Sequence, residues 1–114
     1  MFPEKQRLPS ILVGNVIRQG KRVSANGCEI RMLASINPVS RFAVVVPVST
    51  HKQAVKRNYV RRCIRESIRH LAVTITSPYD FVCFGRKECV GKTQQEIAEI
   101  LTKLFEKFNS KINL

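Results

Sequence analysis

Acidic residues are scarce in this chain, which has eight Asp and Glu against twenty Lys and Arg in 114 residues. A nuclease that uses a divalent metal needs clustered carboxylates, but only Glu96 and Glu99 share a helical face at close spacing. Thr93 and Glu96 have the spacing of a capping box, which already accounts for Glu96. Neither His51 nor His70 has a sequence neighbour that would complete a nucleophilic triad. The sequence therefore argues against a self-sufficient nuclease.

Long apolar runs and metal-binding cysteine pairs are also missing. No stretch approaches the ~20 apolar residues that span a bilayer. The four cysteines form no C-x-x-C pair, and the two histidines are not spaced with them as a zinc site requires. Residues 1–10 do not resemble a signal peptide, so we expect a cytoplasmic location with free thiols. With 44% hydrophobic residues, residues 1–114 should form a single domain around one modest core.

Positive charge is abundant instead. The formal net charge is +12, and the isoelectric point is near 10.2. Such a balance indicates a polyanionic partner, and nucleic acid is favoured over a membrane. A helix that binds a membrane surface would need large apolar anchors, whereas the most basic segment has Val60 and Ile64 on its apolar side.

The segment from Lys52 to Leu71 holds seven of the twenty cations and one acid, Glu66. On a helix at about 100° per residue, its side chains divide into an apolar arc and a basic arc. A solvated face would mix acids and bases at i,i+4 spacing, whereas Arg61, Arg65 and Arg69 lie one above another and repel. The planar guanidinium group of arginine can donate two parallel hydrogen bonds to phosphate oxygens. The basic arc therefore predicts binding to nucleic acid. The apolar arc holds Val60, Ile64, Ser67, Ile68 and Leu71; the basic arc holds Asn58, Arg61, Arg62, Arg65 and Arg69.

Residues 54–67, AVKRNYVRRCIRES, resemble the signature helix of the bacterial ribonuclease P protein, whose pattern is roughly A-V-x-R-N-R-[IV]-[KR]-R-x-[IL]-R-E. Tyr59 departs from this pattern, because the family usually has a third basic residue there. Its ring could stack on a base or ribose, or pack at the edge of the helix. Residues 80–87 are similar to the family's D-[YF]-[IV]-x-x-x-R-K strand, and residues 41–48 and 93–105 to its preceding strand and last helix.

The resemblance implies the protein subunit of ribonuclease P, which assists a catalytic RNA in removing the 5′ leader from precursor tRNA. The implied partners are that RNA subunit and precursor tRNA, with no obligate protein partner. Magnesium would be held mainly by the RNA, none by protein side chains, and no protein residue would be catalytic. The alternative is a general RNA-binding protein, such as a ribosomal protein. A DNA-reading helix-turn-helix is disfavoured, because no second helix is expected directly before Lys52.

The residues that the resemblance assigns to RNA form two groups. Val13 and Ile17 stand where the family carries the aromatic residues of a cleft for the leader, and Met32 is assigned to the same cleft. The second group is expected to bind RNA and holds Lys52, Lys56, Arg57, Asn58, Arg61, Arg62, Arg65 and Arg69, with Arg86 and Lys87 after the later strand. Within it, docking on the RNA subunit is expected of Arg57, Asn58, Arg61, Arg62, Arg65 and Arg69.

The chain is expected to form an α/β (α+β) two-layer sandwich, a small mixed sheet with helices in the order α-β-β(-β)-α-β-α. The resemblance adds a left-handed β-α-β crossover, against the usual hand. Residues 1–8 are expected to be an unstructured basic lead-in, and residues 21–27 a connection. Helices are expected at 10–19, ending in a left-handed Gly20, at 52–71, and from 93 to about 108. Strands are expected at 28–36, at 42–46 as a central strand, and at 81–84.

Overall fold

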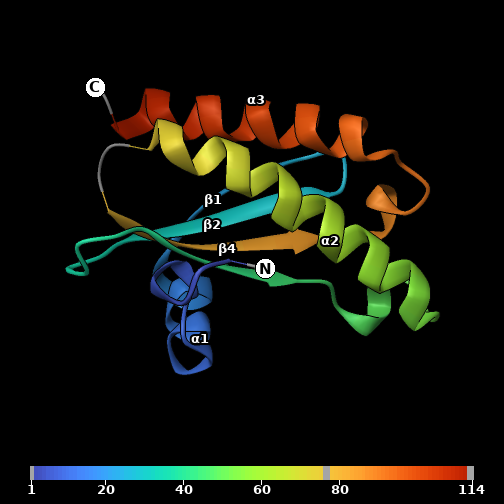
Figure 1. Cartoon of the computed structure of the whole chain (residues 1–114), viewed down its shortest axis with the longest axis horizontal. Coiled ribbons are helices and arrows are strands. Elements are labelled where there is room, and N and C mark those ends of the chain that lie inside the picture. The colour runs from blue at the N-terminus through green and yellow to red at the C-terminus, as the bar shows by residue number, and fades with distance from the viewer. Residues whose placement is uncertain (1, 76–77, 113–114) are drawn as a thin grey trace.

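The computed structural model describes residues 2–75 and 78–112, with side chains described through Phe108. Figure 1 shows the helices and strands of this part of the chain in space. The helices are α1 (Ser10–Gln19), α2 (Ala54–Leu71) and α3 (Gln94–Ile112), and the strands are β1 (Lys21–Ala25), β2 (Cys28–Ala34), β3 (Arg41–Val45) and β4 (Tyr79–Gly85). Short 3₁₀ turns occupy Glu4–Gln6, Val48–Thr50, Ala72–Thr74 and Lys87–Cys89.

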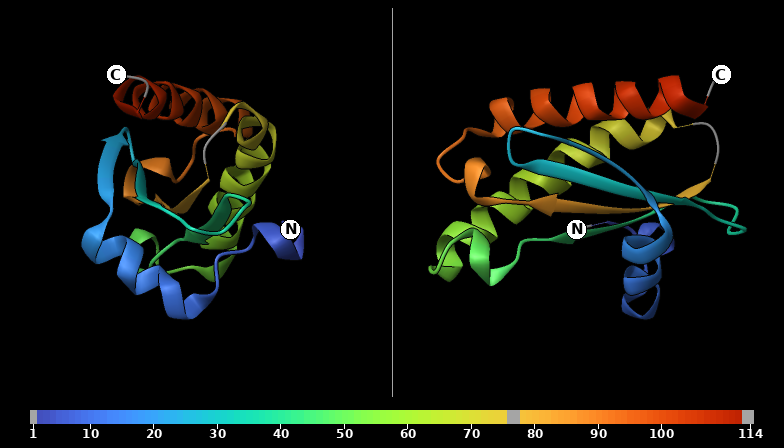
Figure 2. Two further views of the ribbon diagram at one scale, coloured as in Figure 1. Left: turned by 90° about the vertical axis from the view of Figure 1, so that its left-hand side faces the viewer. Right: turned by 180° about the vertical axis from the view of Figure 1, so that it is seen from behind.

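The four strands form one mixed sheet in the order β1-β2-β4-β3. Strand β2 pairs antiparallel with β1 and β4, whereas β3 pairs parallel with β4. Helices α2 and α3 cover one face of the sheet, and α1 packs on the other (Figure 2). The expected mixed α/β fold is therefore confirmed.

The crossover from β3 through α2 to β4 has the unusual hand. Both strands run in the same direction, and α2 lies on the face shared with α3 (Figures 1 and 2). Seen from α2 with the strands pointing upward, β4 lies to the left of β3, so the connection is left-handed. General packing rules favour the opposite hand, and only the family resemblance predicted this one.

A cluster of phenylalanine rings lies in the core between the sheet and the helices α2 and α3. The rings of Phe42 and Phe81 stack with centroids 5.1 Å apart. Phe108 meets Phe81 edge-on at 5.2 Å, and Phe105 lies 5.5 Å from Phe81. Because aromatic side chains bury large apolar areas, this cluster anchors α3 on the sheet.

Helix α2 buries the arc that its sequence predicted, with Cys63 in addition and with Leu71 only half-buried. Its approach to the sheet depends on Gly85 at the end of β4. A Cβ at Gly85 would lie 2.6 Å from Val60 Cγ1 and 3.0 Å from Ile64 Cδ1. The missing side chain thus lets the N-terminal half of α2 close on the end of β4, which leaves the opposite arc of the helix in solvent.

The N-terminal helix and the capping box test two local expectations. Helix α1 spans the expected residues, but Gly20 is extended, with φ −74°, so the predicted left-handed cap is wrong. Glycine is needed there for space, because a Cβ would lie 2.5 Å from the Val16 carbonyl oxygen. Before α3, the Thr93 N–H donates to Glu96 Oε1 at 2.9 Å and the Glu96 N–H to Thr93 Oγ1 at 3.1 Å, so the capping box is confirmed.

Three expectations about the sheet and its edges are wrong. Residues 21–25 are strand β1 rather than a connection; only Asn26 and Gly27, both with positive φ, make the turn. The strand at Phe42 is an edge strand, because β4 lies between β3 and β2. The outer edge of β3, which faces away from β4, is partly covered by residues 2–8. The Leu8 N–H donates to the Phe42 carbonyl at 2.9 Å, and Phe2 is buried. The expectation that this segment is unstructured is therefore wrong.

Candidate nucleic-acid interface

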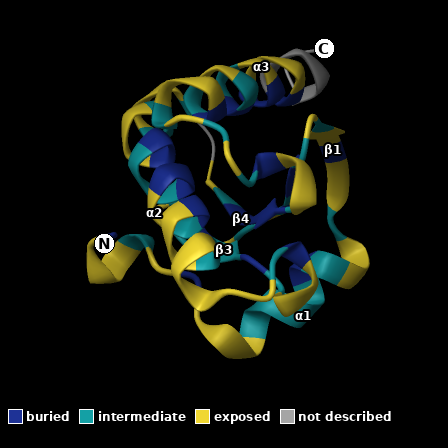
Figure 3. Cartoon of the chain, turned by 90° about the vertical axis from the view of Figure 1, so that its right-hand side faces the viewer, coloured by how far each residue is buried: buried dark blue, intermediate teal, exposed yellow. Residues whose placement is uncertain are grey.

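The solvent face of α2 carries the basic arc. Asn58, Arg62 and Arg69 are exposed, and Arg61 and Arg65 are half-exposed. Figure 3 shows the buried side of α2 turned toward the sheet and α3, with exposed residues on its outer side. Because the helix is held by its apolar arc, these cations project from a rigid element.

Few carboxylates neutralise this face. Glu66 pairs with Arg69 at 2.9 Å, and His70 Nε2 lies 3.5 Å from its other oxygen. Arg61 donates to Asn58 Oδ1 instead. Among the side chains that the structure describes, Arg61, Arg62 and Arg65 form no ion pair. Three adjacent arginines therefore retain donors for an external anion.

A hollow of about 500 Å³ opens among these side chains. Its lining combines arginine guanidinium groups with the Asn58 amide and the Tyr59 ring. The Arg62 guanidinium lies 5.6 Å from the centroid of that ring. A concave basic surface of this kind suits a phosphate backbone. The lining residues are Val55, Asn58, Tyr59, Arg61, Arg62, Arg65 and Glu66.

Arg57, which was assigned to RNA, makes contacts within the protein. Its Nη1 donates to the carbonyls of His51 at 2.8 Å and Lys52 at 3.0 Å. Nearby, the His51 ring accepts a hydrogen bond from the Gln53 N–H at 3.0 Å. Arg57 thus fastens the chain that enters α2, while Lys52 and Lys56 remain exposed at the start of the helix.

Arg86 and Lys87 lie away from this hollow, at the end of β4. The Arg86 guanidinium sits 4.5 Å above the centroid of the Phe84 ring, and its Nη2 is 3.6 Å from Glu29 Oε1. Arg31 shares the same partners: its Nε is 2.6 Å from Glu29 Oε2, and its guanidinium lies 5.8 Å from the Phe84 centroid. Lys87 is exposed.

This cluster on the α1 face of the sheet was missed by sequence reasoning. Glu29 and Arg31 are two positions apart on β2, so they share a face. Phe84 is the register partner of Glu29 on β4. The i,i+2 spacing could have revealed the first pair, but the pairing with Phe84 exists only in the folded sheet.

The residues assigned to the leader cleft do not lie together. Val13 and Ile17 are half-buried against a cluster containing Val82 and Phe84, on the α1 face. Met32 is buried on the opposite face, in the core with Phe81. Successive side chains of a strand point to opposite faces, so the assignment of Met32 to the cleft is wrong.

The cysteines lie outside the arginine-lined hollow on α2. All four cysteines are free and buried, and burial raises the pKa of Cys83 to about 12. Within residues 2–75 and 78–112, no group of three or more His, Cys, Asp or Glu side chains is close enough to hold a metal ion. No helix in that part of the chain has the length and apolar content needed to cross a membrane.

The chain has clear counterparts among known proteins. The family model described as Ribonuclease P matches residues 3–109. Over 58 residues the chain is 40% identical to the ribonuclease P protein components of Bacillus cereus (strain Q1) and Bacillus anthracis (strain A0248). This match covers 51% of the chain and about half the length of these relatives, 50% and 49%.

Solved structures show the same fold. A Staphylococcus aureus RNase P protein mutant with defective mRNA degradation activity has a TM-score of 0.82 at 18% identity, over 91% of this chain and 88% of that one. The RNase P protein from Thermotoga maritima has a TM-score of 0.78 at 22% identity, over 89% of this chain and 96% of that one.

Proposed function

The chain belongs to the ribonuclease P protein family, and on that premise we propose that it is the protein subunit of ribonuclease P. It docks on the RNA subunit through the exposed face of α2 and assists that RNA in removing the 5′ leader from precursor tRNA. The single observation that carries this proposal is the row of arginines at Arg61, Arg62 and Arg65, which project from a rigid helix without ion pairs among the described side chains.

The part of the chain in this reaction is to bind and to orient. The arginines of α2 neutralise phosphates that would otherwise repel one another near the active centre of the RNA. Asn58 can donate and accept, which suits a sugar hydroxyl or base edge beside those phosphates. The RNA subunit holds the magnesium and supplies the cleavage chemistry, so no side chain of this protein acts as acid, base or nucleophile.

The α1 face of the sheet contributes the contact with the leader. Val13 and Ile17 offer apolar cover for a base, and Lys87 offers an exposed cation beyond β4. Val13 and Ile17 cannot stack on a base as an aromatic ring does. The cleft for the leader is therefore weaker or differently shaped in this chain than in the family. Both contacts with RNA operate in the cytoplasm.

Cleavage of precursor tRNA by the purified chain, with and without the host's ribonuclease P RNA, tests the proposal at matched magnesium. Cleavage is expected only when the RNA is present, and more rapidly at low magnesium with protein than without. Cleavage by the protein alone would identify a nuclease. No effect of the protein on the RNA-catalysed rate would identify a plain RNA-binding protein, the alternative for which the family match gives no support.

A further inference from the structure

Among the Phe and Tyr side chains, all of which lie in the described part of the chain, only that of Tyr59 is exposed. The chain has six Phe and two Tyr. All six phenylalanines are buried, and Tyr79 packs its ring against Phe108 at 5.0 Å. Tyr59 is 40% exposed on the basic helix. The core does not account for its ring.

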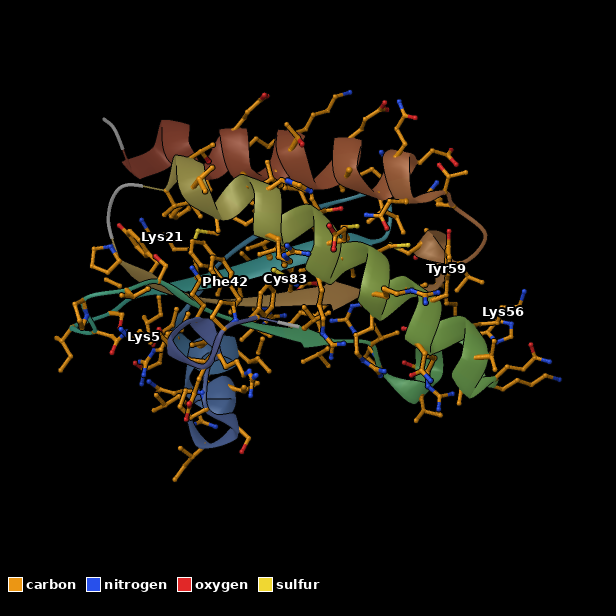
Figure 4. All side chains as sticks on the ribbon, in the orientation of Figure 1. Lys5, Lys21, Phe42, Lys56, Tyr59 and Cys83 are labelled. Carbon is orange, nitrogen blue, oxygen red and sulfur yellow. The ribbon has the colours of Figure 1, made fainter. Side chains whose placement is uncertain are left out.

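The ring stands between two hollows of different character. On one side lies the arginine-lined hollow described above. On the other, a hollow of about 360 Å³ separates α2 from the loop before α3. Figure 4 shows Tyr59 and Lys56 on the N-terminal half of α2, away from Phe42 and Cys83. The second hollow is lined by Val55, Lys56, Tyr59, Val60, Val90, Gly91, Lys92 and Thr93.

These surroundings match the chemistry of an unpaired nucleotide. Single-stranded nucleic acid is typically held by an aromatic face for the base and by cations for the flanking phosphates. Val55 and Val90 supply apolar walls beside the ring, while Lys56 and Lys92 stand at the same hollow. A paired base in a duplex could not reach the ring, because its faces are already stacked. An apolar protein segment would leave both lysines without a counter-charge.

We propose that Tyr59 stacks on an unpaired nucleobase of the RNA subunit docked on α2, and that Lys56 and Lys92 hold the adjoining phosphates. This inference rests on the proposed function and names one contact within it. It assigns a role to the position at which the chain departs from the basic residue typical of its family.

Variants of Tyr59 separate stacking from charge. Tyr59→Ala should weaken binding of the host's ribonuclease P RNA about tenfold at every salt concentration, because a stacked base is lost but no charge. Tyr59→Leu should weaken it nearly as much, since it restores apolar bulk without an aromatic face, whereas Tyr59→Phe should stay within about twofold. Lys92→Ala should lower the log–log salt slope by about 0.7. Val73→Ala, at an exposed apolar position beyond α2, is the matched control and should not change affinity.

Tyrosine fluorescence provides a direct readout, because the chain has no Trp. In a Tyr79→Phe background, Tyr59 is the single emitter. Stacking on a base should shorten its fluorescence lifetime when the RNA subunit is added, and RNA absorption does not distort a lifetime. Thermal unfolding of each variant checks that the fold is retained.

Two results would overturn the inference. One is an unchanged lifetime together with wild-type affinity of Tyr59→Ala. The other is a salt slope that Tyr59→Ala lowers in the parent protein but leaves unchanged when Arg62→Ala is already present. That result would mean that the ring only positions the Arg62 guanidinium, which lies 5.6 Å from its centroid. The proposed function fails separately, if charge removal at Arg61 and Arg65 leaves RNA binding unaltered.

Discussion

The arginines on the α1 face of the sheet and those on the exposed face of α2 differ in their carboxylate partners. On the sheet face beneath α1, Arg31 and Arg86 share Glu29, and Arg41 is held by Asp80 through two hydrogen bonds of 2.9 Å.

On α2, the single acid Glu66 pairs with Arg69, and the three neighbouring arginines form no ion pair among the described side chains. Arg31, Arg41 and Arg86 on the sheet thus pair with buried carboxylates. Arg61, Arg62 and Arg65 on α2 pair with no described carboxylate. The difference indicates that high net charge alone is a poor guide to a binding site; the local supply of acids decides which cations are available.

Removal of a buried carboxylate should have the largest effect on stability. Asp80 is 7% exposed and its hydrogen bonds raise the pKa of Arg41. Asp80→Ala removes the only carboxylate that pairs with Arg41 among the described side chains, and should lower the free energy of unfolding by about 3 kcal/mol. Urea denaturation measures the change. Glu66→Ala, which breaks an exposed pair on α2, is the control; equal losses in the two variants would erase the contrast between the faces.

Charge removal on α2 should have the next largest effect, on RNA affinity rather than on stability. If about six phosphates are neutralised, the log–log salt slope for the RNA subunit should be about four to six. Arg61→Ala with Arg65→Ala should lower that slope by about 1.5 and weaken binding about tenfold or more, while the unfolding midpoint stays close to that of the parent. Filter binding across a salt series measures both quantities.

The matched control removes two cations from the exposed side of α3, in Lys103→Ala with Lys107→Ala. This variant loses the same formal charge and should keep the parental slope within about 0.5. If both double variants lose the same slope, net charge rather than the α2 face governs binding.

Neutralisation of Glu29 tests the role of a buried carboxylate on the α1 face of the sheet. Glu29→Gln keeps the shape of the side chain but removes the charge that holds Arg31 and Arg86. We expect a loss of about 1 kcal/mol in the free energy of unfolding and a salt slope steeper by less than one unit, because two guanidinium groups become available to RNA. Urea denaturation and salt titration measure these changes. Glu99→Gln on exposed α3 is the control, and a stability loss of equal size there would contradict the structural role of Glu29.

The smallest effect is expected at the exposed pair on α2. Glu66→Gln should change the free energy of unfolding by no more than about 0.5 kcal/mol, because exposed ion pairs contribute little. Releasing Arg69 should make the salt slope steeper by up to about 0.7. Filter binding across the same salt series measures this change in slope, with Glu106→Gln as the control. A shallower slope in Glu66→Gln would mean that Glu66 itself orients the arginines for RNA.

Local periodicity in the sequence predicted the two long helices well. The buried arc of α2 through Val60, Ile64 and Ile68 matches the predicted spacing, and the capping box before α3 forms as expected. These features depend on neighbours within one or two helical turns, so they can be read from the chain. Strand β1 was missed because it is short and polar, with Val23 as its one buried residue.

By itself, the sequence determined that a basic arc would lie opposite an apolar arc on one helix, because both follow from a single rotation per residue. Only the tertiary structure decided which cations are neutralised, that Met32 points away from α1, and that β3 lies at the edge of the sheet. Those outcomes depend on pairing between strands far apart in the chain. Glu29 meets Arg86, and Arg41 meets Asp80, only after β2, β3 and β4 have come together.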